Sequence, residues 1–481
     1  IPPGWRDATL YFDQPIRNRP VSTPLDRNDL PSIGTIIPQG MRVLLAAALV
    51  ALLLLILAGA LTIPFAFESP SMWYKFGIEK TSLRAGKMLG LTAGLLILLQ
   101  LPLAGRLKIL DRIFSLPGLI RQHRMHAWAI AILALIHPLC VLLPEGTLIV
   151  PLEMRYWPEW IGVVLLVFIL SQFAVSQWRQ SMGIAFHTWM RFHRIAGLLI
   201  VALLVVHVLY VSESFSEDGL PRLAMIGTAA AFLLFWLWVR SAWLRMRRKP
   251  FLVSRVEPTG SDCTCIELTP TTPHLLSYVP GQFAWVSFAS ATVVPEAHAF
   301  TLSSTPSRPG MLQFTIRACG DWTRTVGELS IGDRAFIQGP FGRFGHLHAD
   351  PDRELIMIAG GIGITPMLSM LRFMADHDDP RPVTLIWSNR GKENVVFADE
   401  MDDLAAKLTG LRMIPIFTRT AEGGERSGRL DRKSLETMLS GCSRRSAVFV
   451  CGPPQMMKQV STDLETIAFP ARLIFTESFG L

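Results

Sequence analysis

Apolar residues are concentrated in the first half of the chain, where they form six uncharged runs separated by polar connections. Each run falls within the roughly 17–25 residues that a membrane-spanning helix needs. Several runs are at the short end of that range, so the predicted helices must extend into the flanking polar residues. Six such runs in succession predict a transmembrane helical domain. The runs are 43–67, 88–105, 127–143, 161–178, 195–211 and 223–239.

The second half of the chain has a different pattern, which begins after the basic segment 245–249 and Pro250. Short β-like runs with turn signals, such as 281–288 and 312–317, come first. From about residue 354 a strand, a glycine-rich turn and a helix follow one another, which predicts a parallel α/β domain. The chain is therefore predicted to have four parts. These are a polar N-terminal segment 1–40, a six-helix transmembrane domain 41–249, a β-rich domain 250–349 and an α/β domain 350–481.

Charge along the chain predicts how the helices are oriented. Basic residues follow the second, fourth and sixth apolar runs, whereas the connections after the third and fifth runs are mostly acidic. The positive-inside rule therefore places both termini in the cytoplasm and makes the third and fifth helices run in the same direction. The net charge of +8 is accounted for by these flanking residues, and no basic stretch interleaved with aromatic residues indicates nucleic-acid binding.

Cysteine usage and the N-terminal segment indicate the compartment. The six cysteines include no CxxC pair, which is typical of a reduced environment rather than of a disulfide framework. Residues 1–40 contain no apolar segment of the kind found in a secretory signal. We expect a multi-pass protein of the plasma (inner) membrane, with the lipid bilayer as its surroundings, and the compact layout indicates a bacterial one.

Four histidines form two pairs with equal spacing in the third and fifth predicted helices. His123 and His137 are fourteen residues apart, and so are His193 and His207. On an α-helix that spacing turns about 1400°, which returns to within about 40° of the same face, with a rise of about 21 Å. Because the two helices run in the same direction, the first members of the two pairs are level with each other, and so are the second members. The pattern predicts two bis-imidazole sites stacked across the bilayer, and such sites hold low-spin b-type haems.

Other interpretations of these histidines remain open at this point. A histidine inside a membrane domain can be a hydrogen-bonded core residue, and membrane histidines also serve in proton relays. Neither interpretation accounts for a regular repeat on two helices followed by a soluble domain. His126 and His187 lie nearby without a matching partner, and we interpret them as interface residues or neighbours of a haem propionate.

Three segments of the second half carry candidate binding residues. The segment HAFTLSS at 298–304 is followed by Arg317 and by GDWT at 320–323. Hydroxyl groups at a strand end can hydrogen-bond a flat ring system, and an arginine can bind a phosphate. The segment AGGIGITP at 359–366 follows an apolar run, and its glycines would let backbone N–H groups approach a pyrophosphate at a helix N-terminus. The third segment, FVCGPP at 449–454, ends a strand with Cys451, which either lines a nicotinamide or is a small buried hydrophobic residue.

Taken together, these features resemble the NADPH oxidase and ferric reductase superfamily, over nearly the whole chain from about Met41 to Leu481. The histidine spacing, HAFTLSS, GDWT, GPFG at 339–342, the glycine turn and CGPP occur in that family's order. The resemblance implies a multidomain membrane protein: a six-helix transmembrane bis-haem bundle, a ferredoxin-reductase-like FAD-binding β-barrel and an α/β NADPH-binding domain. The implied cofactors are FAD, two b-type haems and NADPH.

The resemblance also implies roles for individual residues. The ligands of haem iron would be His123, His137, His193 and His207. The contacts with FAD would be His298, Phe300, Thr301, Ser303, Arg317 and Thr323. The NADPH pyrophosphate would be held by Gly361, Gly363 and Thr365, beside Gly452 and Pro453. Thr418 and Arg419 would bind the 2′-phosphate, which favours NADPH over NADH because a guanidinium group is a bidentate donor for phosphate. Cys451 and Glu477 would border the nicotinamide, and Phe479 would cover the flavin.

The final electron acceptor divides this superfamily. Oxidases reduce O2 to superoxide at the outer haem, and ferric reductases reduce chelated metal there. Arg84, at the outer end of the second helix, is similar in position to an arginine of the oxidases, and a cation there would favour a nascent superoxide anion. The alternative is an interfacial arginine that pairs with a propionate or a lipid headgroup. Val141 stands where animal oxidases carry a second histidine, one turn beyond the outer ligand.

We therefore expect an NADPH oxidase that releases superoxide outside the cytoplasm. The alternatives are a transmembrane ferric-chelate reductase, an electron-delivery subunit for a periplasmic protein, and a transporter with a regulatory nucleotide domain. The sequence indicates no obligatory protein partner. O2 or a ferric chelate is the expected acceptor.

Overall fold

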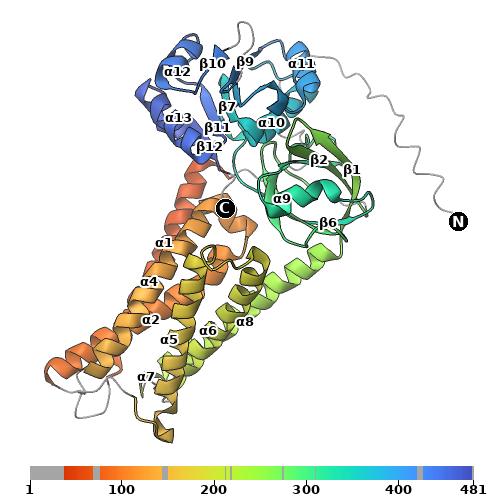
Figure 1. Ribbon diagram of the computed structural model, residues 1–481. Coiled ribbons are helices and arrows are strands. Elements are labelled where there is room, and N and C mark those ends of the chain that lie inside the picture. Colours follow the sequence, from red (N-terminus) through yellow and green to blue (C-terminus); the bar gives the residue numbers. More distant parts are fainter. Residues whose placement is uncertain are drawn as a thin grey trace.

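The computed structural model describes residues 37–68, 76–143, 150–211, 213–216, 219–272, 276–308, 310–419 and 426–478. The chain forms a long helical bundle that carries two stacked β-containing units at one end (Figure 1). Phe479, which the sequence places over the flavin, lies outside the described residues.

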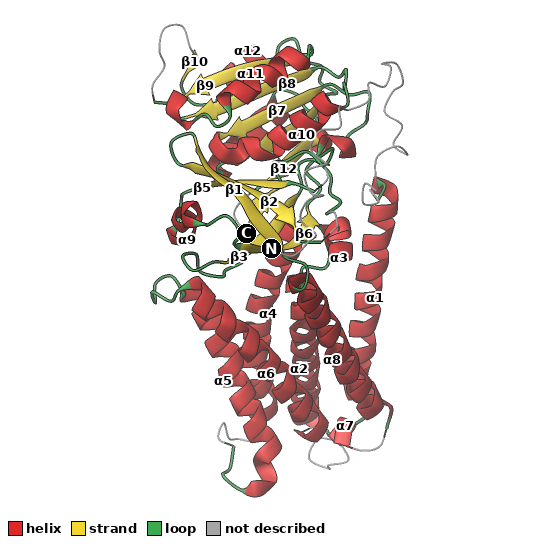
Figure 2. Ribbon diagram, turned by 90° about the vertical axis from the view of Figure 1, so that its right-hand side faces the viewer, coloured by secondary structure: helices red, strands yellow, loops and turns green. Residues whose placement is uncertain are grey.

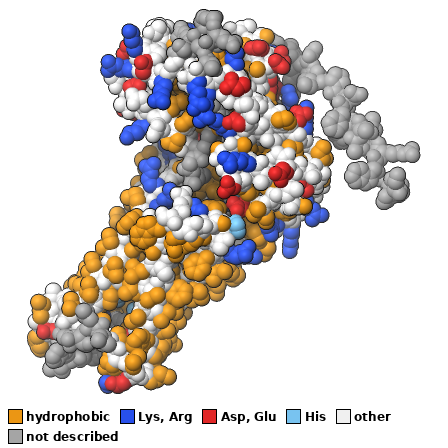
Figure 3. Space-filling model, in the orientation of Figure 1, with side chains coloured by type: hydrophobic (Ala, Val, Ile, Leu, Met, Phe, Trp, Pro, Cys, Tyr) orange, Lys and Arg blue, Asp and Glu red, His pale blue; other side chains and the backbone are white. Residues whose placement is uncertain are grey.

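Within the described residues, six helices are long and apolar enough to cross a membrane, which confirms the number predicted from the sequence. Their hydrophobic side chains face outward and cover the helical part of the molecule (Figure 3), as expected where lipid replaces water as solvent. Each helix extends beyond its apolar run into polar flanking residues. The helices are α1 (Gln39–Ala66), α2 (Gly77–Ala104), α4 (Leu116–Leu142), α5 (Trp157–Trp178), α6 (Phe186–Val211) and α8 (Leu220–Arg247). The short helices α3 (Lys108–Phe114) and α7 (Glu213–Ser216) lie in the connections.

Small residues allow α2 to approach α4 closely. A Cβ atom at Gly86 of α2 would lie 2.8 Å from Val141 Cγ2 on α4, and one at Gly90 would lie 2.9 Å from His137 Nδ1. Both distances are shorter than real carbon contacts, so only glycine fits at these positions. Close packing of this kind is the usual way in which helices associate inside lipid, where the hydrophobic effect gives no driving force between them.

The first soluble unit is an antiparallel sheet of six strands in the order β4-β3-β6-β1-β2-β5. A bridge between Leu302 and Phe314 joins the end of β4 to β5, so the two edges of the sheet meet as in a barrel. Val286, Leu302 and Phe314 are fully buried inside it. The strands are β1 (Phe251–Thr259), β2 (Cys263–Pro270), β3 (Phe283–Ala289), β4 (His298–Thr301), β5 (Leu312–Arg317) and β6 (Arg334–Phe341). The short helix α9 (Asp321–Thr325) follows β5.

The second soluble unit is a parallel sheet in the order β10-β9-β8-β7-β11-β12, which confirms the predicted α/β domain. Every residue of β7 is buried, because helices cover both faces of the sheet (Figure 2). The strands are β7 (Leu355–Gly360), β8 (Val383–Asn389), β9 (Leu411–Phe417), β10 (Arg426–Ser427), β11 (Ala447–Cys451) and β12 (Ile474–Glu477). The helices are α10 (Ile364–Asp376), α11 (Ala398–Lys407), α12 (Arg432–Met438) and α13 (Pro454–Thr466).

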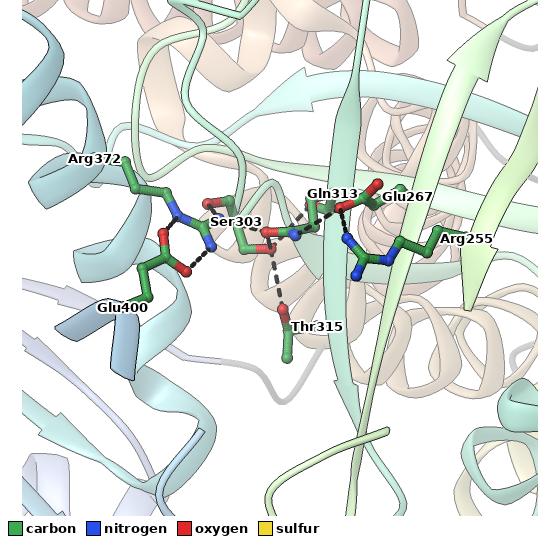
Figure 4. Close-up of polar contacts among 7 residues, drawn as sticks. All are labelled: Arg255, Glu267, Ser303, Gln313, Thr315, Arg372 and Glu400. Carbon is green, nitrogen blue, oxygen red and sulfur yellow. Dashed lines mark hydrogen bonds and ion pairs between the residues drawn. The ribbon is translucent and has the colours of Figure 1, made fainter. Parts of the chain in front are cut away.

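Arg372 of α10 joins the two soluble units (Figure 4). It donates two hydrogen bonds of 2.6 Å to the carboxylate of Glu400 on α11. Its other terminal nitrogen donates to the carbonyl oxygen of Ser303 at 2.7 Å and to the side chain of Gln313 on β5. A guanidinium group held by such a fork has a fixed direction, so this network fixes the barrel against the α/β unit.

Candidate functional site

The carboxyl ends of β7 and β11 form the point at which the strand order of the parallel sheet reverses, which is where open α/β sheets bind their ligands. Two turns leave the sheet there and touch each other. A Cβ atom at Gly363 would overlap the carbonyl group of Cys451 and lie 2.9 Å from Gly452 N, and one at Gly452 would lie 3.0 Å from Gly360 Cα. Only glycine permits this contact between the two backbones. The turn also leads directly into α10. A ligand can therefore come close to the glycine backbone and to the helix N-terminus at once, which suits a pyrophosphate.

The other residues of this turn have structural roles. Gly361 has a φ of +55°, a left-handed conformation that favours glycine, and its carbonyl oxygen accepts a hydrogen bond from Trp387 Nε1 at 3.0 Å. The hydroxyl of Thr365 is buried and donates to the carbonyl oxygen of Ile362 at 3.1 Å. Thr365 therefore stabilises the turn from within, so its predicted contact with a pyrophosphate would have to come from its backbone.

Arg317, at the end of β5, lies beside the same turn although it belongs to the barrel. Its Nη1 is 3.5 Å from the position that a Cβ atom of Gly361 would occupy, and its Nε donates to Asp262 Oδ2 at 2.7 Å. The ion pair orients the guanidinium group while leaving part of it accessible. The structure thus brings a predicted FAD contact and a predicted NADPH contact together at the junction of the two soluble units.

Cys451 and Glu477 are directly opposite each other on the neighbouring strands β11 and β12. Burial raises the pKa of the Cys451 thiol well above its usual value, and Glu477 raises it further, so this cysteine is a neutral thiol. Burial also raises the pKa of Glu477 to about 8, with nearby Asp111 contributing and Arg343 opposing. Glu477 is therefore a protonated carboxylic acid at neutral pH.

Asp111, which the sequence analysis missed, reaches this region from α3 in the membrane domain. Its Oδ2 accepts a hydrogen bond from Gly342 N in the GPFG turn at 2.9 Å, and its Oδ1 accepts from Leu116 N at 2.7 Å. Burial raises the pKa of this carboxyl, and the two backbone donors and Arg343 act against that increase. No sequence motif marks Asp111, because its importance comes from a contact across 231 residues of chain.

The predicted flavin strand β4 has its side chains on two sides. His298 and Phe300 face Trp322 of α9, with ring centroids 4.2 and 5.9 Å away. Burial lowers the pKa of His298, and Glu296, whose Oε2 accepts its Nε2–H at 3.0 Å, raises it. Thr301 is buried.

Ser303 lies on the side of β5 that faces away from the barrel core, with Gln313 and Thr315, whereas Phe314 between them points into the core. Ser303 is fully buried, and its hydroxyl lies 3.1 Å from the carbonyl oxygen of Gln313 and 3.1 Å from Thr315 Oγ1 on β5 (Figure 4). These hydrogen bonds join Ser303 to β5 beside the bridge that closes the barrel, and its predicted contact with FAD remains a prediction.

Thr323 organises the GDWT segment. Its hydroxyl accepts hydrogen bonds from Cys319 N at 3.0 Å and from Gly320 N at 2.8 Å. The side chain thereby closes the first turn of α9 from within. Its predicted position near the FAD phosphates remains a prediction.

Arg419 lies just beyond β9, three strands from β11 in the sheet, and its side chain is exposed. Its backbone N–H donates to the carbonyl oxygen of Arg390 at 3.0 Å. The predicted role of Arg419 at a 2′-phosphate therefore requires a nucleotide that extends along the carboxyl edge of the sheet from the glycine turn.

The membrane helices bring the four predicted histidines together in two pairs. The ring centroids of His123 on α4 and His193 on α6 are 6.0 Å apart, and those of His137 and His207 on the same two helices are 6.4 Å apart. Hydrogen bonds fix three of the rings. His137 Nδ1 lies 2.8 Å from the carbonyl oxygen of Gly86, His207 Nδ1 lies 3.1 Å from that of Pro158, and His193 Nδ1 lies 2.6 Å from the side-chain amide of Gln172.

Arg84 is paired at the other end of the bundle. Its guanidinium group forms an ion pair with Glu68, which also pairs with Lys80 at 3.2 Å, and it lies over the ring of Phe65 at 4.8 Å. The positive charge of Arg84, which the resemblance links to oxygen reduction, is thus partly compensated by a carboxylate of the same chain.

Comparison with known proteins identifies the soluble half. Residues 250–347 match the family model of an FAD-binding domain, and residues 357–462 match that of an oxidoreductase NAD-binding domain. The reductase component of propane 2-monooxygenase from Mycolicibacterium smegmatis is 27% identical over 241 residues, which is 47% of this chain and 66% of that protein. NADH-cytochrome b5 reductase 1 from Dictyostelium discoideum is 31% identical over 153 residues, which is 31% of this chain and 53% of that protein.

A solved structure is similar over the same part of the chain. The cytochrome b5 reductase domain of Ulva prolifera nitrate reductase has a TM-score of 0.43 and 18% identity, covering 48% of this chain and 97% of that domain. The chain spans less than two thirds of the length of the two curated relatives. The two family matches show that the soluble half is an FAD- and NAD(P)H-binding oxidoreductase module of the ferredoxin-reductase-like type. It is joined to helices that are long and apolar enough to cross a membrane.

Proposed function

We propose that this protein is a transmembrane NADPH oxidase, which carries electrons from cytosolic NADPH through FAD and two stacked b-type haems to O2 on the opposite side of the membrane. One observation carries the proposal: two facing histidine pairs, one above the other, in a helix bundle joined to an FAD- and NAD(P)H-binding module. The overall reaction is NADPH + 2 O2 → NADP⁺ + H⁺ + 2 superoxide.

The geometry of the histidine pairs fits a haem between each of them. A metal–imidazole nitrogen bond is about 2 Å long, so two rings that bind one metal from opposite sides have centroids roughly 6 Å apart. The observed separations are 6.0 and 6.4 Å. In the outer pair, hydrogen bonds from Nδ1 to backbone carbonyl oxygens leave Nε2 of His137 and of His207 available to the iron. Such partners of the non-ligating nitrogen are typical of metal-binding histidines.

The soluble residues would hold the other two cofactors. His298, Phe300 and Thr301 would contact FAD, and Arg317 would meet a phosphate at the junction of the two units. The glycine turn 360–363 and Gly452 would admit the NADPH pyrophosphate, and Arg419 would bind its 2′-phosphate. When bound, FAD would accept a hydride and pass single electrons to the haems, which is chemistry that belongs to the cofactors.

The chain itself orients the reactants and handles the proton. The neutral thiol of Cys451 and the neutral carboxyl of Glu477 would present an uncharged surface to the nicotinamide, so that the ring is bound without an opposing charge. Because the pKa of Glu477 is about 8, this carboxyl can release and regain a proton near neutral pH, and it would serve as a proton donor and acceptor beside the bound cofactors.

A transmembrane ferric reductase is the second candidate, and the pairing of Arg84 with Glu68 favours it. A compensated arginine gives less stabilisation to a superoxide anion than a free one does. Both candidates share every step up to the outer histidine pair and differ only in the acceptor.

The deciding experiment is NADPH-driven reduction of cytochrome c by the purified, FAD-supplemented protein, with and without superoxide dismutase. Loss of the signal with the dismutase supports the oxidase. A signal that persists with the dismutase, or that needs a ferric chelate, supports the reductase. Absence of haem absorption bands in the purified protein would contradict both candidates.

A further inference from the structure

A single carboxylate connects the flavin strand to a membrane helix. Glu296, just before β4, accepts a hydrogen bond from His187 Nδ1 on its Oε1 at 3.0 Å and one from His298 Nε2 on its Oε2 at 3.0 Å. The side chain of Glu296 is only 12% exposed, whereas His187 on the first turn of α6 is 46% exposed. His298, a predicted FAD contact, is therefore linked through two hydrogen bonds to α6, the helix that carries His193.

Aromatic rings follow the same route. Phe186 of α6 lies 6.1 Å from the ring of His298 and 5.5 Å from that of Trp189, and Trp189 lies 5.1 Å from His193. All three separations are within the range of aromatic contacts. The rings thus form a continuous series from the flavin strand to the inner histidine pair.

The start of α6 is held in place from the membrane side as well. Arg179, at the end of α5, donates to the carbonyl oxygen of Ile184 at 3.1 Å and lies 5.6 Å from the rings of Phe186 and Trp189. Trp189 Nε1 donates to Ser176 Oγ at 3.3 Å. The first turn of α6 is therefore held by contacts within the membrane domain, independently of its contacts with the barrel. A rigid contact of this kind can set the distance between two domains.

We propose that the first turn of α6 is the contact through which the flavin domain delivers electrons to the inner histidine pair, with the His187–Glu296 hydrogen bond as its positioning element. This inference rests on the proposed function. Other polar contacts also join the membrane domain to the barrel: Arg106 Nη1 donates to Gln338 Oε1 at 3.1 Å, Gly342 N donates to Asp111 at 2.9 Å, and Arg343 Nη1 donates to the carbonyl oxygen of Ile113 at 3.5 Å. These three come from the connection between α2 and α4, whereas α6 itself carries one histidine of each pair.

The test separates two steps in the holoprotein, with FAD and haem bound. In anaerobic stopped-flow mixing with NADPH, flavin bleaching reports hydride transfer, and the haem bands report the next electron transfer. His187→Ala removes the donor to Glu296 but leaves the Glu296–His298 bond. His187→Asn keeps an N–H at nearly the same place, and Thr188→Ala, at an exposed position on the same turn, is the matched control.

We expect flavin reduction in His187→Ala to stay within about twofold of wild type, while haem reduction slows by on the order of tenfold, since small displacements of reacting groups have large kinetic effects. His187→Asn should restore most of the rate, and Thr188→Ala should not change it. The midpoint potential of the inner haem should be the same in all variants, because only the contact between the domains is altered.

A haem reduction rate in His187→Ala equal to that of wild type would overturn the inference, and so would loss of FAD from that variant. Trp189→Leu gives an independent measurement, since it interrupts the ring series without touching Glu296, and Trp189→Phe keeps a ring there. If Trp189→Leu transfers electrons as fast as wild type, the ring series has no part in the contact. Wild-type protein without haem bands would instead defeat the proposed function itself.

Discussion

Gly162 of α5 lies directly against the imidazole of His207 on α6. A Cβ atom at this glycine would come within 2.5 Å of His207 Cε1 and 2.9 Å of Nδ1. The ring also has its Nδ1 fixed by the carbonyl oxygen of Pro158, one turn earlier on the same helix. One helix therefore determines both the orientation of this histidine and the space in which its ring lies.

Gly162→Val should therefore displace the ring of His207 and abolish haem binding at the outer pair. Haem content measured by pyridine hemochrome should fall from two per chain to about one, with the inner pair retained. Gly227→Val is the matched control, because a Cβ at this glycine of α8 meets nothing within 4 Å. Two haems per chain in Gly162→Val would contradict the assignment of His207 as a ligand.

Much of the architecture could be predicted from local pattern. Two features depend only on neighbouring residues: the continuous apolar runs, and the strand that is followed by a glycine turn and a helix. The structure has both. The histidine pairing followed from helical periodicity and orientation. Asp111 and Glu296 could not be found in this way, because each acts through contacts with residues far away in the sequence. The partners of the Ser303 hydroxyl could not be predicted either, because a motif gives the residue type but not the groups on β5 that the hydroxyl meets.

The stability of the folded protein should depend on pH through Glu477. Its pKa is about 8 in the folded protein and near 4.5 without burial, so the carboxyl stays protonated up to about pH 8 only in the native state. The folded state therefore binds more protons than the unfolded state between these values, and stability falls as pH rises through that window. The melting temperature of wild type should decline more steeply between about pH 5 and 8 than that of Glu477→Gln. Equal slopes would show that Glu477 is not held in its neutral form.

The same residue should affect flavin reduction. Above pH 8 the ionised carboxylate would place a charge beside the nicotinamide and would no longer donate a proton. We expect the anaerobic rate of flavin reduction by NADPH to fall with an apparent pKa near 8 in wild type and to be flat in Glu477→Gln. Glu436→Gln, on the exposed surface of α12, should keep the wild-type profile.

Gly363→Ala should disable the nucleotide site without removing FAD. The added Cβ would overlap the carbonyl group of Cys451, and a backbone atom cannot move aside as a flexible side chain can. We expect kcat/KM for NADPH to fall by at least roughly tenfold, which corresponds to about 1.4 kcal/mol of lost transition-state stabilisation. Gly441→Ala, where a Cβ meets nothing within 4 Å, is the control. Release of FAD from Gly363→Ala would show that the two soluble units had separated, and would contradict a local effect.

Arg419→Ser should reduce the preference for NADPH over NADH. A guanidinium group binds a phosphate through two hydrogen bonds, whereas NADH has only a hydroxyl at the same position, so the change removes a contact that one substrate makes and the other does not. We expect KM for NADPH to rise by roughly tenfold to a hundredfold, as for a charge-assisted hydrogen bond of about 1.5–3 kcal/mol. KM for NADH should change by less than about threefold. Arg412→Ser, an exposed arginine on the adjacent strand β9, is the matched control. If both nucleotides lose affinity equally, Arg419 contacts a part that they share, and the 2′-phosphate is bound elsewhere on the carboxyl edge of the sheet.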